Sequence, residues 1–331
     1  MADLKTKYMG LELRSPIIAG SCGLTSDVEK MVEMEKAGVG AVVLKSIFEE
    51  QINEETSGVF KAGYGMGDAY PEAEDYIKAY IRSNTIQKYV ELVRNAKSRL
   101  TIPVIASVNC FSGGEWVSFA RQLEEAGADA LELNVFILPV NEFKESAEVE
   151  NVYFEIVKSI KSQIKIPVSV KISHYFTNLS AFVDKIKAYG ANATTLFNRF
   201  YEPDININTL EMGAASVFST AAELRTTLRW TGILAGKDKK LEISASTGVH
   251  GGEAAVKLLL AGATTVQVCS VLYEKGIHVI EDINNFIGKW MDSKAFKTIE
   301  EYRGMLSYSS IENPDLYERA QFMKYFSKKQ Y

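Results

Sequence analysis

The 331-residue sequence contains few cysteines, and they do not cluster. Cys22, Cys110 and Cys269 are far apart and odd in number, so neither a disulfide framework nor a paired-cysteine metal site is indicated. The same spacing excludes the grouped thiolates that an iron–sulfur centre needs. The sequence therefore predicts a protein of a reducing compartment, expected in the cytoplasm, with no metal site.

Three further signals are missing. The net charge of −5 has no basic block behind it, which argues against a nucleic-acid partner. The N-terminus, MADLKTKYMG, lacks the apolar segment of a secretory signal, and no run of about 18 apolar residues could span a membrane. No GxGxxG motif follows a strand, so a pyridine nucleotide would need a separate electron-transfer subunit.

Four stretches of the chain repeat one pattern. In each, a glycine lies where a helix needs a left-handed terminating residue, and a β-rich apolar run follows at once. The pattern predicts a helix that stops and a buried strand that begins. The stretches are AGVGAVVLKS (37–46), AGADALELNV (126–135), YGANATTLFN (189–198) and AGATTVQVCS (261–270).

Four more strands are predicted at 16–21, 103–109, 167–173 and 241–247, and three of them begin with a proline, where no ladder donor is lost. Their near-continuous apolar character is typical of parallel strands covered on both faces. Eight helical stretches separate the strands: 27–37, 85–99, 114–126, 145–163, 178–189, 218–230, 252–261 and 276–290. Ser26 and Glu29 have the spacing of a capping box for the first. Alternating strands and helices predict an α/β protein, a (β/α)8 TIM barrel formed as one domain over 1–331.

Two connections are longer than the barrel needs. Residues 47–83 follow the second strand, and so long an insertion at a strand's carboxyl end is typical of an active-site lid. Residues 199–217 follow the sixth strand and could do the same. An acidic solvated loop or a dimer contact is the alternative for each. We expect a helical C-terminal extension, 291–331, packed outside the barrel.

Polar residues follow the strands at the end where such barrels build their sites. Lys45 and Lys171 follow apolar runs, where an unpaired charge is costly to bury, so each needs an anion. A strand-end lysine with its head in water explains either one alone. Two of them with three asparagines favour a bound ligand. The full set is Ser21, Lys45, Ser46, Asn109, Asn134, Lys171, Ser173, Asn198, Thr247, Gly248 and Ser270.

The ends of the last two strands fit a phosphate pocket. In STGVHGGE (246–253), Gly248 lets the backbone approach closely, and glycines open the next helix. Thr247 and Ser270 offer hydroxyl groups. A glycine-containing turn that binds no ligand is the alternative.

These residues together resemble the dihydroorotate dehydrogenases, specifically their soluble class 1 branch. The resemblance covers roughly residues 5–305 and rests on SPIIAGS (15–21), GAVVLKS (40–46), LELN (131–134), VSVKISHYF (168–176), TLFN (195–198) and LLLAGATTVQVCSVLYEKG (258–276). It implies an FMN-containing (β/α)8 barrel that passes a hydride between a small organic acid and the flavin. Family members are commonly dimers, so a homodimer is expected by analogy.

The resemblance also implies roles for individual residues. Ala19, Gly20 and Ser21 would lie along the flavin ring, with the strand 2 pair Lys45 and Ser46 in contact with it. Lys171 would face the pyrimidine side and stabilise the charge of the reduced ring. The residues implied near flavin and substrate are Asn109, Asn134 and Asn198; those implied at the ribityl phosphate are Thr247, Gly248, Cys269 and Ser270; and Asn84 would be a substrate-binding asparagine of the loop after strand 2.

The chain departs from the family where the substrate would react. The soluble members carry a catalytic cysteine base three residues after the strand 4 asparagine, and that position is Ile137 here. Pro139 replaces a substrate-binding asparagine, and Arg199 replaces a serine. These changes affect substrate recognition more than flavin binding.

A general base would then have to come from elsewhere. His174, Tyr175 and Cys110 are the nearby candidates. The alternatives are a rim histidine hydrogen-bonded to backbone for His174 and a small buried hydrophobic residue for Cys110. Arg199 fits a clamp on a substrate carboxylate or a salt bridge to the acidic lid. The activity predicted is an FMN-dependent oxidoreductase acting on dihydroorotate or a related acid. The alternatives are a degenerate flavin-binding barrel that serves as an accessory protein, and a Schiff-base lyase that uses Lys171.

Overall fold

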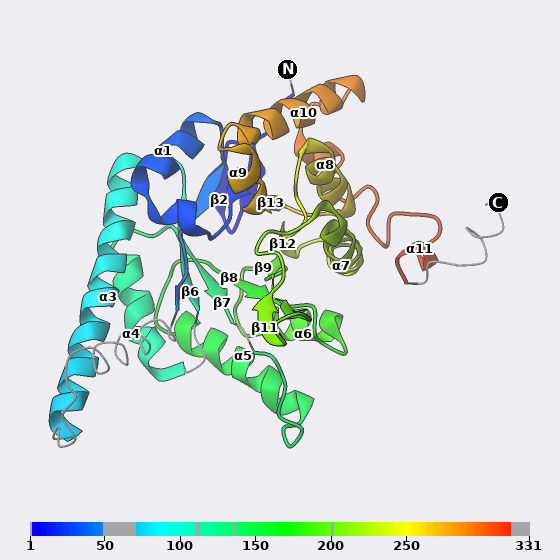
Figure 1. The fold of residues 1–331 in the computed structure, drawn as a ribbon. Helices are drawn as coiled ribbons and strands as arrows, with labels where there is room; N and C mark the ends of the chain where they lie inside the picture. The colour runs from blue at the N-terminus through cyan, green and yellow to red at the C-terminus, as the bar shows by residue number, and fades with distance from the viewer. Residues whose placement is uncertain (1, 49–70, 110–112, 136, 200–201, 319–331) are drawn as a thin grey trace.

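The chain forms a closed barrel of parallel strands surrounded by helices (Figure 1). The computed structural model describes residues 2–48, 71–109, 113–135, 137–199 and 202–318. Around the barrel the strands follow the order β4-β3-β13-β12-β9-β8-β7-β6, and a direct pairing of β4 with β6 closes the ring. The predicted (β/α)8 fold is confirmed.

All eight predicted strands are present within their expected ranges. They are β3 (Ile17–Ala19), β4 (Ala41–Val43), β6 (Val104–Asn109), β7 (Ala130–Asn134), β8 (Val168–Ile172), β9 (Ala193–Leu196), β12 (Glu242–Ala245) and β13 (Thr265–Val268). The helices around them are α1 (Val28–Lys36), α3 (Pro71–Arg99), α4 (Gly113–Glu125), α5 (Ser146–Lys161), α6 (Leu179–Ala188), α7 (Leu224–Lys237), α8 (Gly252–Ala261), the short α9 (Ser270–Lys275) and α10 (Val279–Ser293).

The glycines of the four repeats do what their spacing predicts. Gly38, Gly127, Gly190 and Gly262 all have positive φ, between 95° and 118°, which ends a helix without steric cost. The capping box predicted for the first helix is wrong. Asp27 caps α1 by accepting from the N–H groups of Glu29 and Lys30, while the Ser26 hydroxyl donates to the Gly23 carbonyl.

An N-terminal hairpin closes the end of the barrel at which the strands begin. Strands β1 (Thr6–Tyr8) and β2 (Leu11–Leu13) pair antiparallel ahead of the first barrel strand. Tyr8 and Leu13 pack against inward-facing residues of the barrel such as Ile18, Val43 and Ile105. The interior is therefore a filled core at this end, and any cavity must lie at the carboxyl ends of the strands.

The second barrel strand is interrupted by a bulge. Val43 pairs with Ile105, and Ile47 of the short β5 (Ile47–Phe48) pairs with Val108, so four steps along one strand match three along its neighbour. A bulge bends the strand and re-aims the side chains inside it. Lys45 lies in this bulge, at the mouth of the barrel.

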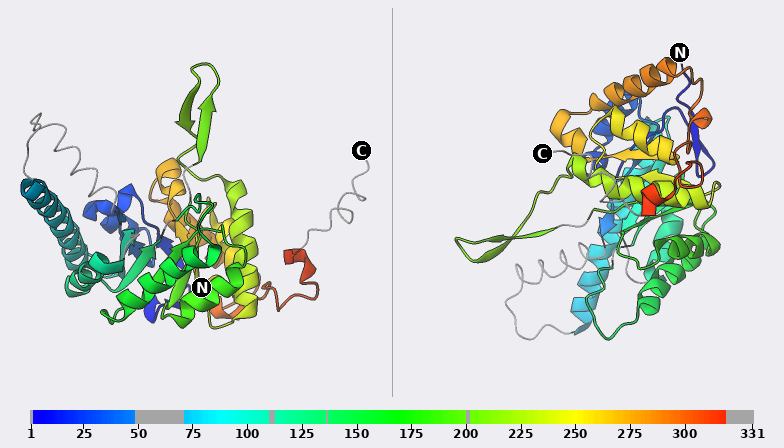
Figure 2. Two further views of the ribbon diagram at one scale, coloured as in Figure 1. Left: turned by 90° about the horizontal axis from the view of Figure 1, so that it is seen from below. Right: turned by 90° about the vertical axis from the view of Figure 1, so that its right-hand side faces the viewer.

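The two predicted insertions differ in what they form. Of the expected lid 47–83, residues 49–70 lie outside the described residues, and 71–83 are the first part of helix α3. The segment after β9 contains an antiparallel hairpin, β10 (Pro203–Asn206) and β11 (Glu211–Ala214), all of it exposed. Figure 2 shows this hairpin, in yellow-green, standing clear of the barrel in both views.

The C-terminal extension is less helical than expected. Between Ser293 and residue 318 it holds only a 3-10 turn, Ile299–Glu301, and the single-turn α11 (Asp315–Glu318). It does pack outside the barrel, because Gly304, Leu306 and Tyr308 donate backbone N–H groups to carbonyls of α8 and α7. In this segment, backbone hydrogen bonds to α7 and α8 take the place of the hydrogen bonds that a helix would form within itself. Within the described residues, no helix is both long and apolar enough to cross a bilayer.

Candidate active site at the carboxyl ends of the strands

Three predicted site residues lie side by side on neighbouring strands. In the register of the sheet, Asn109 of β6 is opposite Asn134 of β7, and Asn134 is opposite Lys171 of β8. All three are buried, with 3%, 7% and 7% of their surface exposed. The amide of Asn198, just beyond β9, donates to Asn134 Oδ1 at 2.9 Å. The structure therefore brings four of the expected residues to one end of the barrel.

The buried ammonium group of Lys171 has a partner within the chain. Its Nζ lies 3.8 Å from Oε1 of Glu132, which is almost fully buried in the middle of β7. Lys171 was expected to need an anion, and a carboxylate of the barrel interior supplies it. A paired charge also explains how the lysine is kept inside an apolar sheet.

Glu132 is a residue that the sequence reasoning missed. Its Oε2 accepts hydrogen bonds from Thr195 Oγ1 at 2.9 Å and from Gln267 Nε2 at 2.8 Å, so three strands hold it in place. The sequence did offer a signal for it: a carboxylate between Leu131 and Leu133, in a strand predicted to be buried on both faces, needs a partner inside the barrel. Its Oε1 has no hydrogen-bond donor among the described residues and faces Lys171.

Lys45 does not share the environment of Lys171. Its side chain is exposed, contrary to the expectation that its charge is buried. The bulge between β4 and β5 takes it out of the regular strand and leaves it at the open mouth of the barrel.

A chain of hydroxyl groups connects the first strand ends. Ser21 Oγ lies 3.0 Å from Ser46 Oγ, and Ser46 Oγ lies 2.7 Å from Ser107 Oγ. Ser107 in turn exchanges backbone hydrogen bonds with the Tyr89 hydroxyl of α3, both at 2.9 Å. Burial raises the pKa of Tyr89 above its ordinary range, so it stays protonated. These contacts fix the ends of β3, β4 and β6 relative to one another.

The loop after β12 has the backbone of an anion-binding turn. Thr247 and Gly248 are both left-handed, with φ of 82° and 78°. A Cβ on Gly248 would lie 2.2 Å from the backbone nitrogen of Leu224, so only glycine fits. Successive left-handed or turn residues direct backbone N–H groups toward one point.

Two further polar side chains join this loop. Ser219 donates its backbone N–H to Ser270 Oγ at 3.0 Å, and its own hydroxyl lies 3.2 Å from His250 Nε2. The other ring nitrogen of His250 lies 3.1 Å from Glu274. Neither Ser219 nor His250 was predicted, because they meet Ser270 only in the folded barrel.

Two adjoining cavities open among these residues. The first, of about 190 Å³, is lined by Lys171 together with Ser21, Phe197, Asn198, Arg199, Val217, Ser219, Ser246, Thr247, Gly248, Val249, Gln267, Cys269 and Ser270. The second, of about 260 Å³, shares Phe197, Asn198, Arg199 and Thr247 with the first and adds His174, Tyr175, Glu202, Glu223, Thr226 and Thr227. A water molecule occupies about 30 Å³ of liquid, so each cavity can hold a small organic group.

His174 and Arg199 both line the second cavity, but they differ in their contacts with the rest of the chain. The His174 ring lies tilted against Tyr175 and edge-to-face with Phe197, and partial burial lowers its pKa below the ordinary 6.5. The imidazole is therefore neutral near pH 7 and able to accept a proton. Arg199 donates from Nε to Glu223 and from Nη1 to the Val217 carbonyl, both at 2.9 Å. The salt bridge expected for Arg199 was one with the acidic segment 47–83, whereas the structure pairs Arg199 with Glu223, just before α7.

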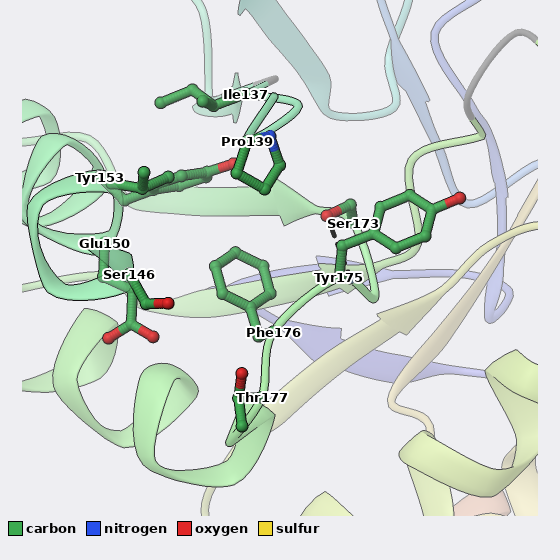
Figure 3. Close-up of a pocket in the computed structure, with 10 residues that line it drawn as sticks. Ile137, Pro139, Ser146, Glu150, Tyr153, Ser173, Tyr175, Phe176 and Thr177 are labelled. Atoms are coloured by element: carbon green, nitrogen blue, oxygen red, sulfur yellow. Dashed lines mark hydrogen bonds between the residues drawn. The ribbon is translucent and has the colours of Figure 1, made fainter. Parts of the chain in front are cut away.

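The apolar residues after β7 line a separate, small cavity. Ile137 and Pro139 lie on one side of it, with Tyr153 and Phe176 from other elements facing them (Figure 3). It measures only about 50 Å³. Ile137 packs against the hydrophobic core and a backbone hydrogen bond links it to the Tyr153 hydroxyl. No proton acceptor stands at the position where the family has its cysteine.

Not all of the expected residues line the two cavities. The following are absent from both linings: Ala19, Gly20, Lys45, Ser46, Asn84, Asn109 and Asn134. Asn84 is exposed and lies inside helix α3, not in a loop, and it lines neither of the two cavities. Cys110 lies outside the described residues. Ala19 and Gly20 are buried at the end of β3, and a Cβ on Gly20 would lie 2.5 Å from Cys269 Sγ, so glycine is required for that close approach.

Comparison with known proteins agrees with this architecture. The catalytic subunit of dihydroorotate dehydrogenase B (NAD(+)) from Thermoplasma acidophilum is 30% identical over 311 residues, which cover 92% of this chain and 99% of that protein. The catalytic subunit from Pyrococcus furiosus is 26% identical over 92% of this chain and 98% of its own. A putative dihydroorotate dehydrogenase A (fumarate) from Aeropyrum pernix is 26% identical over 91% and 97%.

The profile of one family, described as dihydroorotate dehydrogenase, matches residues 3–291, which include the whole barrel. With a buried lysine and two asparagines in register at the strand ends, the chain belongs to the dihydroorotate dehydrogenase family.

Proposed function

We propose that the protein is an FMN-dependent oxidoreductase that passes a hydride between a small organic acid, dihydroorotate or a related compound, and flavin N5. The observation that carries the proposal is the buried row of Asn109, Asn134 and Lys171, which faces the open end of the barrel. The flavin supplies the redox chemistry when bound. The chain supplies the binding groups, the charge and the proton acceptor.

Two acceptor oxygens near the first cavity fit such a cofactor, one on Gln267, which lines the cavity, and one on Asn109 at the end of β6. Asn109 Oδ1 and Gln267 Oε1 are buried without a hydrogen-bond partner in the described part of the chain. Buried polar atoms normally have partners, so these two acceptors suit the N–H groups of a polar heterocycle. Lys171 would stabilise negative charge on the pyrimidine side of the ring, and Glu132 holds that lysine in position.

The phosphate end has its own set of donors. Gly248 and Thr247 offer backbone N–H groups, and Ser270 offers a hydroxyl. His250 lies beside this set, with its Nε2 3.2 Å from the Ser219 hydroxyl. These groups support the assignment of the ribityl phosphate to Thr247, Gly248, Cys269 and Ser270.

The second cavity suits the substrate. Asn198 and Arg199 would bind a small acid there, with Asn134 behind Asn198 as its hydrogen-bond partner, and neutral His174 would accept the proton of the acid while hydride leaves. Asn84, which lies away from the cavity, can take part only through a movement of α3. The relatives named as catalytic subunits with NAD(+) support a separate electron-transfer partner for this chain, and a homodimer remains a prediction.

A second candidate function is favoured by Ile137. An isoleucine packed against the core cannot replace a cysteine base, which supports a barrel that binds flavin without turning over dihydroorotate. Such a protein would serve as an accessory or partner-binding subunit.

One experiment separates the two. The protein is titrated with FMN in the dark, the bound flavin is recorded by absorbance, and dihydroorotate is then added without oxygen. The enzyme hypothesis predicts a bound yellow flavin that bleaches; the accessory hypothesis predicts a bound flavin that stays oxidised. Lys171→Met should slow bleaching at least tenfold, whereas the exposed Lys30→Met on α1 should not change it. A protein that binds no FMN contradicts both.

A further inference from the structure

Two thiols meet beside the first cavity although their residues are far apart in the sequence. Strand β13 pairs with β3, with Val268 opposite Ala19, and Gly20 donates its N–H to the Val268 carbonyl at 3.0 Å. This register puts Cys269 next to the end of β3. Its Sγ lies 3.9 Å from the carbonyl oxygen of Ser21, the residue before Cys22, and the two thiols are close enough for each to shift the pKa of the other.

The two sulfur atoms have different surroundings. The neighbouring Cys269 thiol, with backbone N–H groups of Leu24 and Thr25 and the Tyr273 hydroxyl, lowers the pKa of Cys22 to about 6. The Cys22 thiol and burial raise the pKa of Cys269 well above its ordinary value, and Glu132 adds to this while Lys171 opposes it. At neutral pH one sulfur is a thiolate and the other a protonated thiol.

This is the arrangement of an attacking and a resolving cysteine. Cys22 is partly exposed and can meet a small solute, whereas Cys269 is held against it by two strands. We propose that Cys22 and Cys269 form a reversible disulfide when the protein meets a hydroperoxide. The site is independent of the proposed flavin chemistry.

The chemistry balances in two steps. The Cys22 thiolate attacks one oxygen of the hydroperoxide, so an S–O bond forms, the O–O bond breaks, and water or an alcohol leaves after taking up a proton. The Cys269 sulfur then attacks the Cys22 sulfur, an S–S bond forms, the S–O bond breaks, and water leaves with the Cys269 proton. Two thiols lose two electrons and the hydroperoxide gains them; an added dithiol reverses the change by exchange.

The bond would join the ends of β3 and β13. Ser21 and Ser270, the neighbours of the two cysteines, line the first cavity, as does Cys269 itself. Covalent closure at this place would narrow the cavity at the position proposed for the phosphate. Oxidation should therefore weaken FMN binding, an effect that rests on the proposed function, whereas the disulfide itself does not.

The experiment treats the purified, fully reduced protein with hydrogen peroxide at a small molar excess, and then counts thiols after denaturation. We expect two of the three thiols to be lost and to return with dithiothreitol. Peptide mass analysis without reduction should show Cys22 joined to Cys269. A count of three remaining thiols, or a crosslink that involves Cys110, overturns the proposal.

Three variants test the assigned roles. Cys110→Ser should still lose two thiols. Cys22→Ser should protect Cys269, and Cys269→Ser should leave a sulfenic acid on Cys22 that dimedone traps. Alkylation of Cys22 by iodoacetamide in the wild type should accelerate with a midpoint near pH 6, and a midpoint near the ordinary 9.0 contradicts the thiolate. The wild-type mass analysis stands even where a variant fails to fold.

Discussion

Lys171 and Lys45 follow similar apolar runs in the sequence, yet the barrel treats them differently. Lys171 lies within a regular strand whose register places it between Asn134 and Thr195, and it is buried against Glu132. Lys45 lies in a bulge and is exposed. The difference teaches that a polar residue at a strand end can be assigned a burial only when the pairing of that strand is known.

Removing the buried charge tests this comparison most severely. Lys171→Met should reduce the free energy of unfolding by about 3 kcal/mol, because the Glu132 carboxylate is left buried without its cation. Urea unfolding measures the loss. The double variant Lys171→Met with Glu132→Gln should recover most of it. A loss below about 1 kcal/mol in the single variant would show that the ion pair contributes little to the free energy of unfolding.

Changing the carboxylate alone should have an intermediate effect. Glu132→Gln keeps an oxygen for Thr195 and Gln267 but removes the negative charge beside Lys171. We expect a loss of about 1–2 kcal/mol, smaller because the ammonium group lies closer to the mouth of the barrel and can gain water. If the flavin proposal holds, the reduction potential of bound FMN should also rise, since Lys171 then acts uncompensated. An unchanged potential would argue that Lys171 lies away from the ring.

The exposed lysine supplies the matched comparison. Lys45→Met should change the free energy of unfolding by no more than about 0.5 kcal/mol, as surface substitutions usually do. In the FMN-loaded protein it should nonetheless slow flavin reduction if its ammonium group contacts the ring. Stability and reduction rate measured on the same preparation separate the two effects. A large loss of stability would mean that the bulge does not leave Lys45 in solvent.

The smallest effect is expected from His174. Because its folded pKa lies below 6.5, the unfolded chain binds a proton in the window between the two values while the folded chain does not. Stability therefore rises with pH across that window, and His174→Gln should flatten the rise. Unfolding measured from pH 5 to pH 8 checks this. In the enzyme assay the same variant should remove the low-pH limb of the rate profile, and a retained limb would assign the base elsewhere.

Much of the scaffold could be predicted because its signals are local. Proline-led apolar runs and left-handed glycines mark where each strand begins and each helix ends, and they need no tertiary information. Asn109, Asn134 and Asn198 were identified for the same reason, since a barrel places every strand end on one face. The capping residue of α1 and the C-terminal tail were predicted less well. In both, contacts with neighbouring groups competed with the local preference.

The site residues that the sequence did not predict share one property: their contacts are with residues distant in the sequence. Glu132 belongs to the site because it pairs with Lys171. Ser219 belongs to it because it bonds Ser270, and His250 because it lies beside Ser219. Cys22 and Cys269 are far apart in the sequence, yet the pairing of β13 with β3 brings the Cys269 sulfur to the residue before Cys22. Spacing along the sequence cannot show such pairs.

By itself, the sequence determined the order of strands and helices, the closed parallel barrel and the end of it that carries polar groups, because these follow from apolar periodicity and backbone preference. Only the tertiary structure decided which charges are buried, which are paired and which thiols lie close together. Those properties depend on register and on the few ångströms between side chains of separate strands, where desolvation and pairing nearly cancel.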